Sequence, residues 1–243
     1  MMASETASNR RSPWRERMRE RTANEIRQSA AKLLNEHGID AVSIRAVARE
    51  LGMSSPAIYR YFSNHEDLVN AVIVDVFDEL NTHLDNEVAA VSSVRDKIVT
   101  ASWAFREWAA GHPHEFELIL LHPLPPNVSA EVVEARRRFG TTFMRLFSRL
   151  WNEHGYDAPA PEEMTEQQHT MVERFRSNTD GAFDLPPQAL LVFIRSWTKL
   201  YGVVCMEAMG QNTLLGDAAG LLFEMELADM GDCLGVPRRP PHK

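Results

Sequence analysis

The stretch Ser43–Leu68 reads SIRAVARELGMSSPAIYRYFSNHEDL and predicts two short helices joined by a tight turn, followed by the start of a third helix. Ser43 can cap the first helix, because its hydroxyl can accept a backbone N–H of the first turn. Gly52 ends that helix, since glycine reaches the left-handed conformation without a steric penalty. Ser54 and Pro56 suit the start of the second helix. This order of elements is typical of a helix-turn-helix.

Apolar spacing predicts which side chains of this stretch face inward. The first helix has apolar residues at helical intervals along one face, and Ile58, Tyr61 and Phe62 supply the inner face of the second helix. Ser63 and Glu66 form a capping-box pattern that opens the next helix. The inward face of the first helix consists of Ile44, Val47, Ala48 and Leu51.

The segment GIDAVSIRAVARELGMSSPAIYRYFSNHEDLVNAVI resembles the DNA-binding domain of the TetR family of transcriptional regulators. The matching features are the glycine after the first helix, the I-x-x-V-A-x-x-L-G core, and I-Y-x-Y-F before an acidic-Leu pair. The resemblance covers about residues 21–77. It implies that the second short helix enters the major groove and that Arg45 contacts bases. Family members often carry a lysine where His65 stands, so the resemblance implies a weaker phosphate contact here.

Small side chains on the second helix allow close approach to base edges, and Tyr or Arg side chains can reach phosphates or bases. An arginine-rich arm before a helix-turn-helix can add contacts to the backbone or the minor groove. We therefore expect double-stranded operator DNA as a partner. The candidate DNA-binding residues are Ser43, Arg45, Ser54, Ser55, Pro56, Ala57, Tyr59, Arg60, Tyr61, His65, Arg19 and Arg21.

The distribution of charge agrees with local DNA contact. The 243-residue chain has a net charge of −8. Residues 1–65 nevertheless carry 11 Lys and Arg side chains against 7 Asp and Glu, whereas the remaining residues carry 15 against 27. A basic head and an acidic body therefore predict that only the head binds nucleic acid.

Length and periodicity predict an all-α chain in successive parts. We expect a mobile basic arm (1–20), a three-helix DNA-binding domain (21–67), a connecting helix (68–90), an effector-binding and dimerisation domain (91–235), and a disordered tail (236–243). The first helix is expected to begin near Ala23. The sequence has no run of 18 or more apolar residues and no apolar region typical of a signal peptide, so we expect a cytoplasmic protein without a membrane span.

The two C-terminal helices, expected within residues 187–234, have long apolar faces. A helix-turn-helix protein gains affinity and a second half-site by dimerising. These helices are therefore predicted to form a four-helix interface in a homodimer. The segment RSWTKLYGVVCMEAMG also resembles a C-terminal domain type of the same family, although Tyr201 stands where a histidine is usual.

The predicted body is rich in large aromatic side chains, which could line a small-molecule cavity as well as fill a core. Polar side chains among them could orient a ligand. The candidate effector-binding residues are Trp103, Arg106, His122, Arg136, Phe139, Phe143, Phe175, Trp197 and Tyr201.

Catalytic and metal-binding patterns are weak. The histidines near residues 112–122 lack the paired spacing that places metal ligands on one helix face, and no phosphate loop or nucleophile elbow is present. Cys205 and Cys233 are expected to be small buried side chains, with a redox pair as the alternative. No cofactor is predicted.

Together these features predict a homodimeric repressor that a small effector releases from a palindromic operator. One alternative is an effector-independent, architectural DNA-binding protein. The other is a helical enzyme with an incidental helix-turn-helix.

Overall fold

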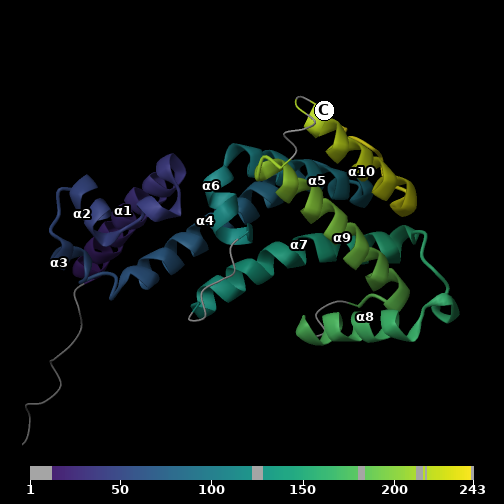
Figure 1. The fold of residues 1–243 in the computed structure, drawn as a ribbon. Coiled ribbons are helices and arrows are strands. Elements are labelled where there is room, and N and C mark those ends of the chain that lie inside the picture. The colour runs from purple at the N-terminus through teal and green to yellow at the C-terminus, as the bar shows by residue number, and fades with distance from the viewer. Residues whose placement is uncertain (1–12, 122–127, 180–183, 212–215, 217, 242–243) are drawn as a thin grey trace, which may run out of the picture. The chain divides into compact units, whose positions relative to one another are not determined.

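The computed structural model describes residues 13–121, 128–179, 184–211, 216 and 218–241 (Figure 1). These residues form helices and connecting segments, with no strand among them. The prediction of an all-α fold is confirmed. His122 and residues 1–12, 180–183 and 242–243 lie outside the described residues. The sequence-based expectations about them therefore stay predictions.

The helices follow one another with short connections. Their bounds are α1 (Pro13–His37), η1 (Ile39–Ala41), α2 (Ile44–Glu50), α3 (Ser55–Ile58), α4 (His65–Ala89), α5 (Val94–Gly111), α6 (Pro113–Phe116), η2 (Glu117–Leu121), α7 (Ala130–His154), η3 (Pro161–Glu163), α8 (Glu166–Asn178), α9 (Pro187–Ala208) and α10 (Ala219–Leu234).

The chain divides into two compact units, and the division lies between Val74 and Asp75, inside α4. We call the unit up to Val74 the head and the unit from Asp75 the body. In the head, α2 packs against both α1 and α3. The head core is formed by apolar side chains of all four helices, including Ile26, Leu34, Val47, Ile58 and Leu68.

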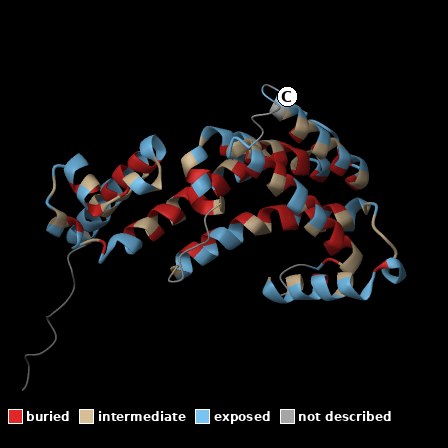
Figure 2. Cartoon of the chain, viewed as in Figure 1, coloured by how far each residue is buried: buried red, intermediate tan, exposed pale blue. Residues whose placement is uncertain are grey.

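In the body, α5 packs against α7 and α9, and α9 also packs against α8 and α10. Figure 2 shows buried residues concentrated on the faces that these helices turn toward one another. The five helices thus surround a core that is rich in aromatic rings, including Phe105, Phe116, Phe143 and Phe223.

The N-terminal part of the structure differs from the expectation of a mobile arm that reaches residue 20. Helix α1 begins at Pro13, ten residues before the predicted start. The side chains from Trp14 to Arg21 are exposed, so core periodicity could not reveal this part of the helix.

The C-terminal residues also differ from the expected disordered tail. Val236 is 8% exposed, and its backbone N–H donates to the carbonyl of Gly231 at 3.0 Å. Arg238 and Arg239 pair with Asp232 and Glu224 of α10. These contacts hold the segment after α10 along that helix.

Helix α9 is long and apolar enough to cross a membrane by length and composition alone, as the core helices of globular proteins often are. Half of its most apolar window is buried inside the body. Its neighbours α5, α7, α8 and α10 therefore cover much of the apolar surface of α9.

Candidate functional site

The first helix of the helix-turn-helix begins as its sequence predicts. Ser43 has extended backbone angles, and its Oγ accepts a hydrogen bond from the backbone N–H of Ala46 at 3.2 Å. Ile44, Val47 and Ala48 are buried, and Arg45 is exposed. The cap therefore sets the start of α2 so that Arg45 faces solvent.

The turn after α2 depends on a glycine in the left-handed conformation. Gly52 has a φ of 63°, a value that side chains with a Cβ rarely adopt. The backbone N–H of Met53 then donates to the carbonyl of Ala48 at 2.8 Å. This closes the end of α2 and directs the chain into α3.

The short helix α3 buries one side and presents the other. Ile58 is fully buried and Phe62 is 8% exposed, whereas Tyr59 is 51% exposed. Ser54 caps α3 without a side-chain hydrogen bond. Ser55, Ala57 and Tyr61 are partly exposed, and Ser54, Pro56 and Arg60 are exposed.

The side chain of His65, another DNA-binding candidate, is hydrogen-bonded within the head. Its Nε2 lies 2.7 Å from the carbonyl oxygen of Val42, so this nitrogen donates. The start of α4 also differs from the expected Ser63–Glu66 capping box. The helix begins at His65, and Asn64 Oδ1 accepts from the backbone N–H of Asp67 at 2.8 Å. Asn64 therefore occupies the capping position one residue later.

Two arginines near the start of α1 belong to the same unit. Arg19 donates from Nη2 to the backbone carbonyl of Arg60 at 3.4 Å. Arg21 pairs with Glu25 at 3.1 Å, and both side chains are largely exposed. The head thus brings Arg19 to the end of the α3 segment, while Arg21 lies farther along α1.

The body contains a cluster of aromatic rings contributed by α5, α7 and α9. The ring of Trp197 lies 5.5 Å from that of Phe139 and 5.1 Å from that of Phe143. Phe105 lies 5.3 Å from Phe139. Most of these rings pack edge to face or tilted, as aromatic side chains in protein cores do, and Phe105 stacks on Trp197 at 6.2 Å.

The space beside this cluster is small. A cavity of about 20 Å³ lies between α5, α7, α9 and α10, with an almost entirely apolar lining. That volume is close to the minimum for one water molecule. Among the candidate effector-binding residues, Phe143 and Trp197 line it. Sequence reasoning did not single out as cavity-lining the non-aromatic side chains, which include Ile98, Ser102, Ser196, Leu227 and Met230.

The other described effector candidates are distributed around the body. Phe175 of α8 packs its ring 6.1 Å from Phe193. The hydroxyl of Tyr201 donates to the backbone carbonyl of Leu120, and burial raises the pKa of Tyr201 to about 12. Arg136 is exposed on α7.

Arg106 and Glu207 form a bidentate ion pair that joins α5 to α9. Both nitrogen–oxygen distances are 2.7 Å, and the two side chains are 20% and 22% exposed. The guanidinium also lies 4.8 Å above the Phe223 ring and 5.6 Å from the Trp103 ring. The hydrogen bonds to Glu207 raise the pKa of Arg106. The guanidinium is therefore already paired with a carboxylate of the same chain.

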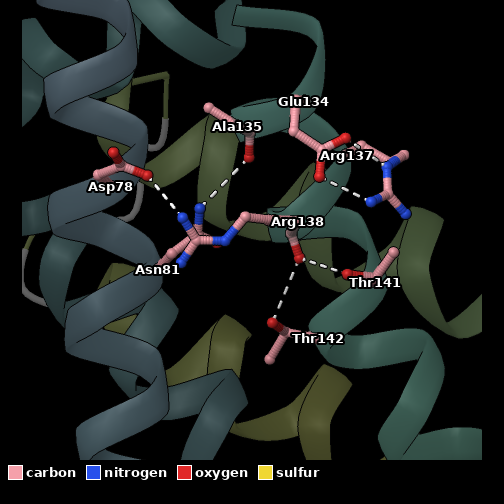
Figure 3. Close-up of polar contacts among 8 residues, drawn as sticks. All are labelled: Asp78, Asn81, Glu134, Ala135, Arg137, Arg138, Thr141 and Thr142. Atoms are coloured by element: carbon pink, nitrogen blue, oxygen red, sulfur yellow. Dashed lines mark hydrogen bonds and ion pairs between the residues drawn. The ribbon is translucent and has the colours of Figure 1, made fainter. Parts of the chain in front are cut away.

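Figure 3 shows the polar contacts between α4 and α7 within the body. Asn81, which is 1% exposed, donates from Nδ2 to the backbone carbonyl of Ala135 at 3.3 Å. One turn away on α4, Asp78 accepts from Arg138 at 2.8 Å, and both side chains are about half exposed. These contacts connect α4 with the helix that carries Phe139 and Phe143.

The two cysteines are free thiols. Burial raises the pKa of both Cys205 and Cys233, which lowers the thiolate fraction and hence the reactivity. Among the described residues, no group of three or more His, Cys, Asp and Glu side chains is placed to hold a metal ion.

The head therefore has the architecture of a helix-turn-helix DNA-binding domain. Residues 26–72 match the family of bacterial regulatory proteins of the TetR type, and residues 98–230 match the tetracycline repressor-like C-terminal domain. These matches cover both units. The chain belongs to the TetR family of transcriptional regulators.

Similar proteins extend over most of the chain. The HTH-type transcriptional regulator Rv1816 of Mycobacterium tuberculosis is 26% identical over 202 residues, which cover 79% of this chain and 83% of that protein. The crystal structure of the regulatory protein SCO4313 superposes with a TM-score of 0.70 at 26% identity, covering 88% and 97% of the two chains. RolR, crystallised with its ligand resorcinol, shares the fold with a TM-score of 0.55 at 15% identity, covering 93% and 97%.

Proposed function

We propose that this protein is a homodimeric repressor that binds a palindromic operator through α2 and α3. A small-molecule effector, bound in the body, would release it from the DNA. The protein would bind its operator DNA in the cytoplasm. The observation that carries the proposal is the exposed pair Arg45 and Tyr59, held on two short helices whose opposite faces are buried in the head.

The test of this DNA interface is a pair of arginine variants with the same change of charge. Arg45→Ala is expected to weaken binding to a specific duplex by roughly 5- to 150-fold, which is the range for losing one good base contact. Arg149→Ala removes an exposed arginine of α7 that pairs with Glu153 in the body. Equal binding by both variants would contradict the assignment of Arg45.

The surface of α9 and α10 supports dimerisation through these helices. Met206 of α9 and Met209 directly after it are 46% and 52% exposed, and Leu221 and Met225 of α10 are each 57% exposed. Gly202 lies inside α9, where a Cβ would meet no atom within 4 Å. Packing within one chain therefore does not require this glycine. A second copy that approaches α9 closely would require it, as small residues permit close helix packing.

The apolar side chains that line the cavity beside Phe143 and Trp197 favour a small apolar or aromatic effector. The solved relative RolR binds resorcinol, a compound of that kind. At about 20 Å³ the cavity is too small for such a ring. Effector binding would therefore have to move α5, α7, α9 or α10 apart, and the state with the larger cavity would be the one that the effector stabilises.

Helix α4 is the proposed route from the effector to DNA, since it contributes to both units. Its contacts with α7 through Asn81 and Asp78 would transmit a movement of α7 to α4. The two reading helices of a dimer must match successive major grooves, roughly 34–36 Å apart. An effector that favours a mismatched state by about 3 kcal/mol would lower DNA affinity by roughly a hundredfold.

The small size of the cavity also favours a second candidate, a DNA-binding protein that acts without an effector. The two candidates differ in ligand-dependent stability. A ligand that binds only the folded protein raises its melting temperature. A rise with resorcinol or a related small aromatic compound, together with loss of operator binding, would favour the effector-released repressor.

A further inference from the structure

The chain turns back at the end of α10 through a glycine in the left-handed conformation. Gly235 has a φ of 64°, and its backbone N–H donates to the carbonyl oxygen of Gly231. The N–H of Val236 donates to the same oxygen at 3.0 Å. A helix end of this type places the side chain that follows the glycine against the last turn of the helix. We call residues 235–241 the strap.

The inner side of the strap packs closely on α10. A Cβ at Gly231 would lie 3.1 Å from the carbonyl oxygen of Val236 and 3.7 Å from its Cγ2. Val236 is 8% exposed, and Pro240 is also buried. The absence of a side chain at Gly231 therefore lets the strap lie directly on the helix.

The outer side of the strap is held by two ion pairs in contact with solvent. Arg238 pairs with Asp232 at 3.2 Å, and Arg239 pairs with Glu224 at 2.6 Å. The two carboxylates belong to residues that lie about 12 Å apart along α10. All four side chains are between 35% and 68% exposed, so each pair holds the strap only weakly.

Val236 connects the strap with the apolar cavity of the body. It lines the cavity of about 20 Å³ together with residues of α5, α7, α9 and α10. Among the described residues of this lining, Val236 is the one that lies outside a helix. The helical walls pack against one another through buried side chains. Segments held by few and exposed contacts open most readily, so the strap is the wall that requires the least free energy to move.

We propose that the strap is the movable wall of the effector cavity and that Val236 limits the size of the ring that the cavity accepts. This inference rests on the proposed function, which places the effector in this cavity. The strap opens to admit a small apolar or aromatic compound. Helix α10, released from Val236, can then move away from its neighbours, and the strap closes over the bound compound.

The experiment measures the exchange of two probes, fluorobenzene and 4-fluorotoluene, by fluorine NMR, which gives the affinity and both rate constants. The strap variant combines Arg238→Glu with Arg239→Glu, so that each new carboxylate faces an acidic partner on α10. The control variant combines Arg137→Glu with Arg149→Glu. These two arginines are exposed and pair with glutamates of their own helix, α7.

The strap variant is expected to bind and release both probes at least about fourfold faster than the wild type, because two attractive pairs become repulsive. The control variant should keep the wild-type rates. Adding Asp232→Arg to the strap variant restores one pair with its charges exchanged, so the exchange should become slower again. A strap that only stabilised the fold would affect affinity without raising the association rate.

The size limit is tested with two valine variants. Val236→Ala should shift the ratio of the two affinities toward 4-fluorotoluene by about fourfold, which corresponds to the burial of its additional methyl group. Val132→Ala removes the same volume from a fully buried position of α7 that does not belong to the cavity lining. It should leave the ratio unchanged.

Three results would overturn the inference. Equal association rates in the strap variant and the wild type would show that the strap does not control entry. An affinity ratio unchanged by Val236→Ala would remove Val236 as the size limit. In both cases the proposed effector site would stand, because the probes still bind. Binding of neither probe to the wild type or to any variant would contradict the effector site as well, whereas the operator-binding half of the proposed function would remain to be judged from the Arg45→Ala comparison.

Discussion

Asn81 of α4 donates a hydrogen bond to the backbone carbonyl of Ala135 in α7, across 3.3 Å of buried interior. The Oδ1 atom of the same amide is buried and has no hydrogen-bond partner. A buried polar group with one satisfied and one unsatisfied atom contributes little net stability. The hydrogen bond between Asn81 and Ala135 therefore serves mainly to fix how α4 lies against α7, and it adds little to the free energy of unfolding.

Asn81 can be tested with two substitutions of similar size. Asn81→Leu removes both polar atoms and is expected to change the free energy of unfolding by less than about 1 kcal/mol. Asn81→Asp loses the donor and buries a carboxylate beside a carbonyl, so it should destabilise by at least about 2 kcal/mol. Urea unfolding at neutral pH measures both. Similar stability of the two variants would contradict the buried hydrogen bond.

Gly202 and Gly140 provide a matched test of the proposed dimer. Both lie inside long helices, and a Cβ at either position would meet no atom within 4 Å. Gly202→Leu is expected to raise the dimer dissociation constant at least about tenfold, because the new side chain separates two packed copies of α9. Gly140→Leu, on α7, should leave it unchanged. Sedimentation equilibrium distinguishes them, and equal dissociation constants would place the interface elsewhere.

The ion pair of Arg106 and Glu207 should contribute more to stability than exposed pairs. Glu207→Gln removes the charge that faces a partly buried guanidinium and is expected to lower the free energy of unfolding by about 1–2 kcal/mol. Glu153→Gln breaks a pair whose side chains are about half exposed, so it should have little effect. If chemical denaturation found the two losses equal, the burial of the Arg106 pair would have no energetic consequence.

Tyr201 should make stability depend on alkaline pH. Its pKa is raised by burial to about 12, above that of an unfolded tyrosine near 10. The folded state therefore holds the phenolic proton more tightly, and the free energy of unfolding should fall as the pH rises from about 10 to 12. Tyr201→Phe should show a smaller fall. Thermal melts across this range measure the difference, and identical pH profiles would contradict the buried phenol.

The local features of the helix-turn-helix could be predicted from the sequence because neighbouring residues determine them. The cap at Ser43, the left-handed Gly52 and the inward side chains of Ile58 and Phe62 are formed within one stretch. The roles of the outward side chains in DNA binding remain predictions. Even here a one-residue shift changed the cap from Ser63 to Asn64.

Contacts between distant residues could not be predicted from periodicity. Arg106 and Glu207 are 101 residues apart in sequence, and nothing in either local pattern indicates that they meet. The same holds for Tyr201 and Leu120, which are 81 residues apart. The aromatic composition of the body indicated a core for most of these side chains and left open which of them line a cavity. Only the packing of Phe139, Phe143 and Trp197 reveals that most of that volume is filled.

Nuclease footprinting on DNA upstream of the protein's own and adjacent genes tests the central claim most directly. The measurement is made at fixed salt, with and without small aromatic compounds. We predict a symmetric protected site of about 20 base pairs, as expected for two half-sites one helical turn apart, and loss of protection when an effector is added. Uniform binding that depends on salt but protects no discrete site would contradict it.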